Sequence, residues 1–488
     1  MEASALGRIT PIMRHRRRAI VVGIVVLSNV LAWAIPNDVA GLVARERPVL
    51  LGRYSREHVL WNFALLMVSL ATVHVGLART PAARRRRAFQ AAAVAGGVFV
   101  SGCLVDMGLR LAGTAPHYVM DPLAYRRPPQ VAWTLPVVDR PAAAFSYPVV
   151  PEGYPAFTAA FRTDARGFRN RADVAQAEVL FIGDSFVEGS RVSDEQTVAV
   201  RFAELSGLST YSLGMSGYSP RRYLAVLEQY GLELRPRVVV CLLYEGNDLR
   251  ATEDVDEDTG FGLGKFVTVF VKQSPILRSL DGLLVGSLGR LGVGRTYSGI
   301  EKIAWLPFRV PDGPAGRFYA FAPKQITQGY LTPAEFEGSR EWKALASILN
   351  RMQGVCRAAG IRLVLGFAPN KAHVALPPAL DRLPAEAVRS FAAIASRKLP
   401  DAQAFVRALP ERFEAREAVV RRWCESSGVE FVSLTGPLRE SVVRGEQVYY
   451  TYDQHWTPLG HDLAARVLAE AFAARGLRPS PLSSTSSP

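Results

Sequence analysis

Two short segments, far apart in the chain, carry residues that could perform nucleophilic catalysis. The first is the Gly-Asp-Ser sequence that ends at Ser185, and the second is the Asp-Gln-His-Trp sequence that contains Asp453 and His455. A serine hydroxyl becomes an effective nucleophile when a histidine takes its proton and an acid orients that histidine. Gly-Asp-Ser is also a common turn, because all three residue types favour turns. The first segment therefore needs support from the rest of the chain.

Two further segments between them supply hydrogen-bond donors. The segment 214–218 is rich in glycine and includes Gly217, where a backbone N–H can approach a ligand with no side chain in the way. The segment 244–248 offers the side-chain amide of Asn247. Such donors stabilise the oxyanion that forms when a nucleophile attacks a carbonyl. Together the four segments provide a nucleophile, a base, an orienting acid and oxyanion donors.

Strands must position these segments. Short runs rich in β-branched residues alternate with helical stretches and lie at 178–183, 210–214, 237–244, 362–368 and 430–434. This alternation predicts a parallel, doubly wound sheet, in which ligands bind at the carboxyl ends of the strands. The Ser185, Gly217 and Asn247 segments follow the first three runs. Apolar residues at helical spacing predict helices between the strands, for example over 342–356 and 419–424.

In these four blocks and their order the chain resembles the SGNH, or GDSL, hydrolase superfamily over residues 176–476. The resemblance implies an α/β fold, a flavodoxin-like three-layer sandwich with a five-stranded parallel sheet. It implies that Ser185 is the nucleophile and that His455 is the general base. The amides of Ser185 and Gly217 and the side chain of Asn247 would form the oxyanion hole. Residues expected to support the blocks are Gly183, Asp184, Gly246, Asp248 and Trp456.

The position of the acid departs from the family pattern. The family usually places its acid three residues before the histidine, but that position is Tyr452 and the acid is Asp453. An Asp-x-His-Trp sequence is similar to the branch that includes alginate O-acetyltransferases. Asp453 is therefore expected to orient His455. The stretch 163–169, Thr-Asp-Ala-Arg-Gly-Phe-Arg, resembles one that is frequent in membrane-anchored members and has no assigned chemical role.

The resemblance leads us to expect an esterase that cleaves O-acyl esters, such as O-acetyl groups, of a cell-surface glycan through an acyl-enzyme at Ser185. An O-acetyltransferase that modifies exopolysaccharide is the alternative, and it requires a multi-span membrane protein as acyl donor. A non-catalytic glycan-binding or assembly protein is a second alternative. The expected partners are an ester-bearing glycan or small ester, the lipid bilayer and that donor. No cofactor is expected, and no metal, because the sequence has no CxxC or Cys/His cluster.

Charge and apolar runs indicate a membrane region. The 488 residues carry a formal net charge of +14, with arginines clustered at 16–18 and 84–87 beside apolar runs. We interpret these clusters as topology signals and not as a nucleic-acid surface. Within residues 1–112, three stretches approach the length that crosses about 30 Å of hydrocarbon. These predicted transmembrane helices are 19–35, 58–78 and 88–105.

The basic residues also predict the orientation. They lie before the first stretch and between the second and third, which favours a cytoplasmic N-terminus in a bacterial cytoplasmic membrane and an extracytoplasmic catalytic domain. A cleaved signal peptide is the alternative for the first stretch, because residues 32–34 form a small-x-small cleavage sequence.

Three other segments have no catalytic motif. The Pro-rich segment 113–175 is predicted to be an extended linker or a layer draped over the domain. The insertion 249–340 could form a lid, a membrane-facing surface or a wall of the substrate cleft. The Ser/Pro-rich tail 477–488 is predicted to be disordered.

Several polar residues lie near the motifs. Lys371 and His373 follow the fourth predicted strand, where substrate contact is one interpretation and a solvated loop is the other. His461 and Asp462 are expected to face solvent or to cap the first turn of the last helix.

Four further residues are expected to be structural. Glu188 and Glu245 adjoin the motifs without an assigned task. Cys356 and Cys424 could be neighbours, but buried free thiols are the prediction for both.

Overall fold

A computed structural model of the chain describes residues 19–20, 22–34, 48–50, 54–78, 80–109, 119–120, 125–140, 151–250, 274, 276, 308–396 and 398–477. The chain divides into two compact units, Met1–Pro116 with Leu263–Ile300 and His117–Gly262 with Glu301–Pro488. All four predicted motif segments belong to the second unit.

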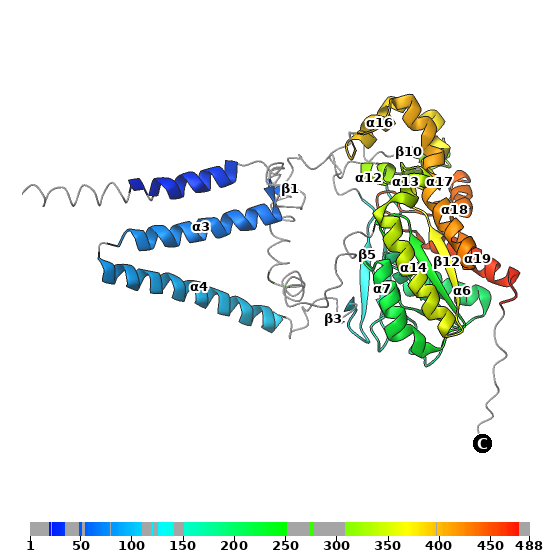
Figure 1. Cartoon of the computed structure of the whole chain (residues 1–488), viewed down its shortest axis with the longest axis horizontal. Coiled ribbons are helices and arrows are strands. Elements are labelled where there is room, and N and C mark those ends of the chain that lie inside the picture. Colours follow the sequence, from blue (N-terminus) through cyan, green and yellow to red (C-terminus); the bar gives the residue numbers. More distant parts are fainter. Residues whose placement is uncertain are drawn as a thin grey trace, which may run out of the picture. The chain divides into compact units, whose positions relative to one another are not determined.

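A five-stranded parallel sheet forms the centre of the second unit (Figure 1). Its strands are β7 (Val179–Ile182), β8 (Thr210–Ser212), β9 (Val238–Tyr244), β12 (Arg362–Ala368) and β13 (Glu430–Ser433). They lie in the order β13-β12-β9-β7-β8, and every neighbouring pair is parallel. Counted along the chain, this is the 2-1-3-4-5 order of flavodoxin-like folds. The predicted strands and fold class are confirmed.

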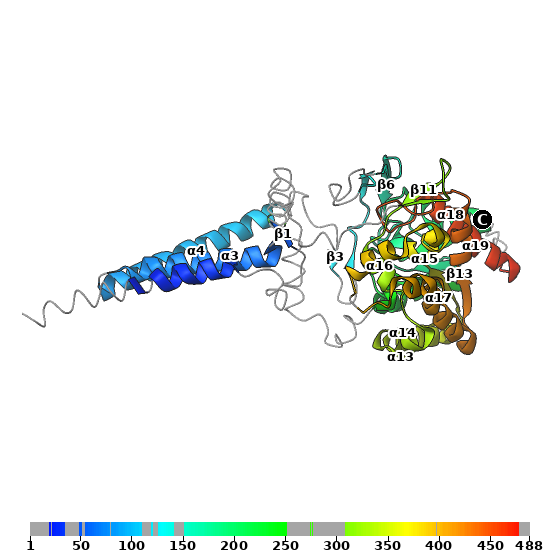
Figure 2. The same ribbon diagram turned by 90° about the horizontal axis from the view of Figure 1, so that it is seen from above.

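Helices cover both faces of this sheet (Figures 1 and 2). Alternate residues of β9 enter different cores, since Val240 packs in one buried cluster and Cys241 in the other. The first cluster includes side chains of α6 (Val198–Ser206), α18 (Thr435–Val443) and α19 (Pro458–Ala474). The second includes α7 (Pro220–Val226) and α14 (Arg340–Ala358). The long helix α17 (Ala402–Ser427) contributes to both.

The predicted helical patterns are confirmed in α14 and α17. The residues buried along α14 are Trp342, Leu345, Leu349, Met352 and Cys356, all on the expected stripe. Helix α17 ends at Gly428, whose φ of 68° is a left-handed conformation that glycine adopts without strain. Cys356 and Cys424 are buried free thiols, as predicted.

Shorter elements complete this unit. They are α5 (Ser185–Glu188), η3 (Asp194–Gln196), η4 (Leu227–Gly231), η5 (Leu232–Leu234), η6 (Asp248–Arg250), α12 (Pro323–Thr327), α13 (Pro333–Gly338), α15 (Lys371–Ala375), η8 (Pro377–Arg382) and α16 (Ala385–Ala393). The short strands form two-stranded antiparallel pairs: β3 (Val119–Met120) with β4 (Tyr125–Arg126), β5 (Ala132–Val137) with β6 (Phe157–Arg162), and β10 (Phe308–Val310) with β11 (Arg317–Tyr319).

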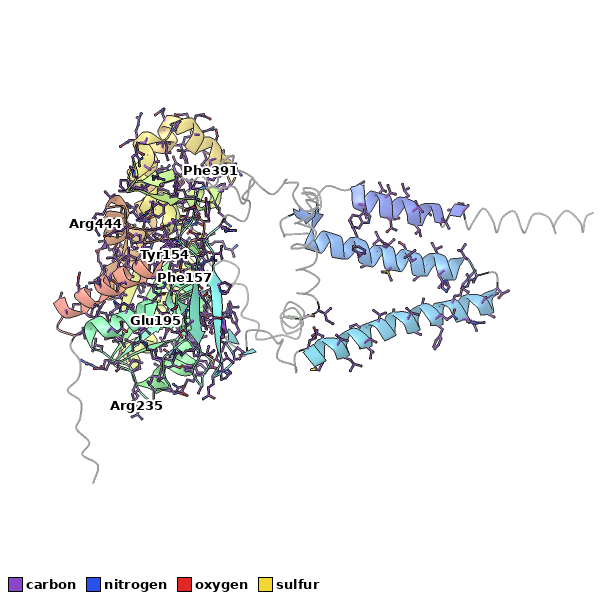
Figure 3. The ribbon with its side chains drawn as sticks, turned by 180° about the vertical axis from the view of Figure 1, so that it is seen from behind. Tyr154, Phe157, Glu195, Arg235, Phe391 and Arg444 are labelled. Atoms are coloured by element: carbon purple, nitrogen blue, oxygen red, sulfur yellow. The ribbon has the colours of Figure 1, made fainter. Side chains whose placement is uncertain are left out.

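The described part of the Pro-rich segment is folded onto the domain, which fits a layer draped over the domain and not an extended linker. Val137 and Ala159 of the β5–β6 pair pack with Tyr450, and the rings of Tyr154 and Phe157 meet edge to face. Figure 3 labels Tyr154 and Phe157 in this part of the domain. The segment lacks periodicity in the sequence because much of its binding to the domain is polar. Arg169 shows this most clearly: its buried guanidinium donates to four backbone carbonyls and to a carboxylate.

The described part of the insertion belongs to the core. Val310, Tyr319, Phe321 and Ile326 are buried in the first hydrophobic cluster, and Phe336 is buried in the second. Burial of these apolar side chains excludes residues 308–340 as a detached lid. The rest of the predicted insertion, apart from Leu249, Arg250, Ser274 and Ile276, lies outside the described residues, as does the tail 478–488.

The first unit contains apolar helices. Helix α4 (Pro81–Leu109) is long and apolar enough to cross a membrane, with a mean hydropathy of 1.8 and none of its apolar window buried. Val22–Ala34 and Asn62–Gly76, the latter within α3 (Arg56–Gly76), are shorter apolar helices. Among the described residues of this unit, β1 (Pro48–Leu50) also pairs with β2 (Tyr54–Ser55). One span candidate stands among the described residues, and the three-span topology remains a prediction.

The apolar helices of the first unit contact one another through polar groups. Asn29 Nδ2 donates to Ser69 Oγ at 2.8 Å, and Asn62 Nδ2 donates to the Ala32 carbonyl at 3.3 Å. Polar side chains commonly join helices in lipid, where an unpaired polar group is costly. The outer surfaces carry exposed aromatic side chains such as Phe89 and Phe99. An apolar medium would cover these side chains favourably.

His461 is buried, and the expectation that it faces solvent or caps the helix is wrong. It is 1 % exposed, its ring meets Trp456 edge to face at 5.4 Å, and Thr457 caps α19 instead. Burial lowers the pKa of His461 to about 3, and the charges of Arg169 and His455 act in the same direction. Asp462 lies on the outer side of the helix, in ion pairs with arginines.

We predict that the domain loses thermal stability as the pH falls from about 6.5 to about 5. The unfolded chain binds a proton at His461 near the ordinary histidine pKa, whereas the folded chain binds it only near pH 3, so acid favours unfolding. Tryptophan fluorescence of the full chain, followed through thermal unfolding, measures this loss. The variant His461→Gln should lose less Tm over the same range. An equal loss in both proteins would contradict the assignment.

Candidate active site

The serine segment is a turn between β7 and the short helix α5. A Cβ at Gly183 would lie 2.4 Å from Val187 Cγ2, so only glycine lets the strand turn this closely into the helix. The Asp184 carboxylate caps α5 by accepting the Phe186 N–H at 2.9 Å. Ser185 is partly exposed, while the residues on both sides of it are buried. The turn therefore presents the serine hydroxyl at the carboxyl end of the sheet.

His455 contacts both the serine and the predicted acid. Its Nε2 lies 2.8 Å from Ser185 Oγ, and its Nδ1 lies 2.5 Å from Asp453 Oδ1. The backbone N–H of His455 donates to the same carboxylate oxygen at 2.9 Å. A spacing of two residues therefore lets one carboxylate hold both the ring and the backbone of the histidine. The structure brings the three predicted residues together in the order Ser–His–Asp.

The Asp453 carboxylate is ionised in this arrangement. Burial acts to raise its pKa, but the charge and hydrogen bonds of His455 and the charge of Arg191 outweigh burial and hold the pKa well below its usual range. Arg191 Nη1 lies 3.4 Å from Asp453 Oδ2. An ionised acid beside Nδ1 favours the tautomer in which Nε2 faces the serine as a proton acceptor.

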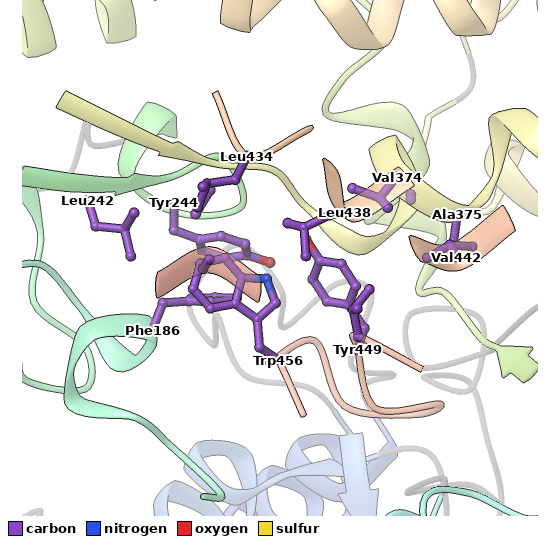
Figure 4. Close-up of a cluster of buried hydrophobic side chains, with 14 of the residues drawn as sticks. Phe186, Leu242, Tyr244, Val374, Ala375, Leu434, Leu438, Val442, Tyr449 and Trp456 are labelled. Atoms are coloured by element: carbon purple, nitrogen blue, oxygen red, sulfur yellow. The ribbon is translucent and has the colours of Figure 1, made fainter. Parts of the chain in front are cut away.

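A cluster of aromatic side chains packs beside His455. Phe186, the residue after the serine, stacks on Tyr244 at 4.1 Å and meets Trp456 edge to face at 4.8 Å (Figure 4). Its ring also lies 5.2 Å from the His455 ring. Trp456 is fully buried, so its predicted supporting role is explained by packing. Through these contacts the loop that carries His455 and Trp456 packs against α5, the helix that begins at Ser185.

The segment of Gly217 is tied to the serine helix through Glu188. The buried carboxylate of Glu188 accepts the Ser216 N–H at 2.9 Å and forms an ion pair with Arg127 at 2.8 Å. Gly217 is exposed and has a φ of +82°, a backbone conformation that favours glycine. Glu188 was expected to be structural, and the structure shows that it holds the loop that contains Ser216 and Gly217.

The segment of Asn247 is joined to the serine turn directly. Asn247 Nδ2 donates to Asp184 Oδ2 at 3.0 Å. The adjacent Asp248 is buried and accepts the Tyr244 N–H, and burial raises its pKa well above the usual range. A Cβ at Gly246 would lie within 2.5 Å of the Tyr244 ring, so the turn requires glycine there. All four predicted segments thus meet at one edge of the sheet.

Lys371 and His373 do not reach this edge, and the predicted substrate contact is not supported. Both side chains are fully buried: α15 packs against α17 and α18, and Lys371 donates to backbone carbonyls of the loop that carries Asp453. Burial lowers the pKa of Lys371 to about 7, although the charges of Asp139 and Asp453 oppose it. His373 Nδ1 lies 2.9 Å from the buried Glu245. Burial acts to lower the pKa of His373, but Glu245 and Glu414 raise it to about 9.

His373 also belongs to a group of three side chains whose distances could suit a metal. Its ring and the carboxylates of Glu414 and Glu417 offer ligand atoms within 4.8 Å of one another. Arg439 donates to Glu414 at 2.7 Å and Arg421 donates to Glu417 at 2.7 Å. Ion pairing accounts for these contacts without a metal.

The sequence did not identify two residues that contact the loop of Asp453 and His455. Asp139, in the Pro-rich segment, accepts the Thr451 N–H at 2.7 Å and the Tyr452 N–H at 3.0 Å. Arg191 pairs with Asp453 and has a φ of 66°, which is unusual for a residue with a side chain. Neither lies in a recognisable motif. Arg169, by contrast, is the last residue of the stretch 163–169, which the sequence analysis had singled out.

Comparison with known proteins gives one family match. Residues 328–485 match a family model described as an SGNH hydrolase-like domain, acetyltransferase AlgX. The matched region contains Asp453 and His455. No curated protein matches the chain.

Solved structures with similarity to the chain include an acylhydrolase, a lipase and an acetyl xylan esterase. A putative acylhydrolase from Bacteroides fragilis has 12% identity and a TM-score of 0.26, covering 63% of this chain and 90% of that one. A GDSL-like lipase from Bacteroides thetaiotaomicron has 13% identity and a TM-score of 0.26, with 61% and 88% covered. An acetyl xylan esterase from Butyrivibrio proteoclasticus has 11% identity and a TM-score of 0.27, with 66% and 70% covered.

The family match and the geometry agree on the class of protein. The match covers the loop of Asp453 and His455, and that loop meets Ser185 at the edge of a flavodoxin-like sheet. The arrangement is that of a hydrolase or acyltransferase. Over residues 328–485 the chain is similar to the SGNH hydrolase-like domain family.

Proposed function

We propose that the chain is a serine enzyme that breaks O-acyl esters through an acyl-enzyme at Ser185. The observation that carries this proposal is the 2.8 Å contact between His455 Nε2 and Ser185 Oγ, with Asp453 at 2.5 Å on the other side of the imidazole. This geometry meets the distance requirement for a base that takes the serine proton.

The first half of the reaction forms the acyl-enzyme. Ser185 Oγ attacks the ester carbonyl while its proton passes to His455 Nε2, and Asp453 stabilises the imidazolium that results. The oxyanion would accept hydrogen bonds from the amides of Ser185 and Gly217 and from Asn247 Nδ2. Collapse of this intermediate breaks the bond to the alcohol oxygen, which leaves with the proton from His455.

The second half of the reaction decides between hydrolase and transferase. A water molecule or a sugar hydroxyl attacks the acyl carbonyl, His455 takes the proton of the attacking oxygen, and Ser185 leaves with a proton from His455. Water gives a free acid, whereas a sugar gives a new ester. The same residues perform both reactions, so access to the site determines the product.

We further propose that the substrate is an O-acetylated glycan at the cell surface and that the apolar helices anchor the domain. Helix α4, with its window unburied and Arg84–Arg87 in its first turns, supports membrane association. Arginines that flank a span favour the cytoplasmic side, which would orient the catalytic domain outward.

An O-acetyltransferase is the second candidate, and the name of the matching family, acetyltransferase AlgX, favours it. In this case a multi-span membrane protein would supply the acyl group to Ser185, and the glycan would be the acceptor. The non-catalytic alternative is disfavoured, because a binding protein has no need of a Ser–His–Asp contact.

Replacement of the serine tests the common mechanism. The full chain in detergent should hydrolyse a small acetyl ester, and Ser185→Ala should lower kcat/KM by at least about a thousandfold, because the variant lacks the attacking oxygen. A fluorophosphonate probe should label the wild type and the control Ser206→Ala but not Ser185→Ala. An unlabelled, inactive wild type would favour the non-catalytic alternative.

Replacement of the acid tests the role of Asp453. In Asp453→Asn the imidazole keeps its neighbour but loses the charge that sets its tautomer, so kcat should fall by about 10³- to 10⁴-fold. Steady-state kinetics on the same ester measure this loss. Asp462→Asn, which alters a carboxylate outside the site, should retain normal kcat. Full activity of Asp453→Asn would remove the acid from the mechanism.

Acetyl content of the surface polysaccharide separates the two candidates. Cells that carry Ser185→Ala in place of the wild type should gain polysaccharide acetyl if the enzyme is an esterase, because acetyl groups are no longer removed. They should lose acetyl if the enzyme is a transferase. Base-released acetate, measured per unit of polysaccharide, gives the sign. No change would reject this glycan as the substrate.

A further inference from the structure

The loop that carries Asp453 and His455 is held by two buried charged side chains outside the triad. The first is Asp139, which is 4 % exposed. Its carboxylate accepts the backbone N–H groups of Thr451 at 2.7 Å, Tyr452 at 3.0 Å and Asp453 at 3.3 Å. It also accepts the Tyr154 N–H at 2.8 Å from its own segment. One carboxylate thus binds three successive amides of the loop.

The second is Lys371, which is 0 % exposed. Its Nζ donates to the carbonyls of Tyr450 at 3.1 Å, Thr451 at 2.6 Å and Asp453 at 2.9 Å. A lysine ammonium has three N–H donors and no acceptor, so its protonated form can donate to these carbonyls. Lys371 and Asp139 therefore bind complementary groups of the same four-residue loop.

The residue held from both sides is Asp453. Its N–H is bound by Asp139 and its carbonyl by Lys371, while its side chain orients His455. Arg191 adds a third tie, because it contacts the Asp453 carboxylate and donates to the Val138 carbonyl next to Asp139. The position of the acid thus depends on the β5–β6 region and on α15.

Burial of two charges is a costly way to hold a loop. An isolated charge in an apolar interior is strongly unfavourable, and it persists only where hydrogen bonds and an opposite charge compensate it. Here the backbone of one short loop provides the hydrogen bonds for both charges. A misplacement of about 1 Å at a catalytic group can cost about 100-fold in rate, so exact placement has a clear benefit.

We propose that Asp139 and Lys371 are positioning residues that clamp the acid–base loop so that Asp453 and His455 keep their alignment with Ser185. The inference rests on the proposed function. It makes the segment between the apolar helices and the sheet part of the active site, and it gives Lys371 a task that does not involve the substrate.

Three variants test the clamp: Asp139→Asn, Asp139→Ala and Lys371→Met. The full chain in detergent is assayed on a small acetyl ester well below each Tm. We expect kcat to fall by about 10- to 100-fold with KM nearly unchanged, because alignment and not binding is lost. Asp139→Asn keeps one acceptor oxygen and should lose less than Asp139→Ala. The exposed controls Glu152→Gln and Lys343→Met should keep normal kcat.

The double variant Asp139→Asn/Lys371→Met distinguishes a shared task from separate ones. If both side chains act through one loop, its kcat should be close to that of the worse single variant, since coupled residues are not additive. Losses of kcat that multiply would overturn the clamp, as would variants that lose Tm but keep full kcat below it. If Lys371→Met does not fold, the two Asp139 variants decide.

Failure of the clamp differs from failure of the proposed function. Wild-type turnover that depends on Ser185 establishes the function in the same assay, whatever the clamp variants do. If the wild type is inactive and unlabelled by a fluorophosphonate, the proposed function fails and the clamp as a catalytic device fails with it. If the wild type is active and the Asp139 variants equal it, only the clamp is rejected.

Discussion

A hydrogen bond between Ser185 and His455 joins residues that lie 270 positions apart, and the architecture of the domain serves to make that contact. The serine is fixed by the turn from β7 into α5, which glycine and a capping aspartate make possible. The histidine is fixed by a loop that precedes α19. A parallel sheet brings both to one edge, because all of its strands end on the same side.

Polar contacts, more than apolar ones, complete the loops at that edge. Apolar packing secures the sheet and its two helical layers, whereas the loops are tied by buried charges such as Glu188, Arg169 and Asp139. Arg169 and Asp139 each bind several backbone groups, and Glu188 binds a backbone N–H and the Arg127 guanidinium, which offsets the cost of taking each charge out of water. Hydrogen bonds are directional, so they hold a loop in one defined conformation. Catalytic side chains need such a fixed conformation.

The burial of Lys371 and His373 illustrates how position in the fold changes the role of a residue. Both follow a strand at the carboxyl edge, where side chains commonly meet ligands. The chain turns into α15 immediately afterwards, and both side chains are buried in the domain. Lys371 donates to backbone carbonyls of the loop that carries Asp453, whereas His373 pairs with Glu245.

Sequence patterns alone predicted the fold class, the five strands, the stripe of α14 and the four blocks at the sheet edge. Each of these features depends on local periodicity or on a short motif, and both can be recognised in the amino-acid sequence. The folded structure was needed to show that His461 is buried, that residues 308–340 belong to the core, and that Asp139 and Arg191 contact the loop of His455. These features depend on contacts between segments distant in the chain, and no local pattern of residue types encodes such a contact.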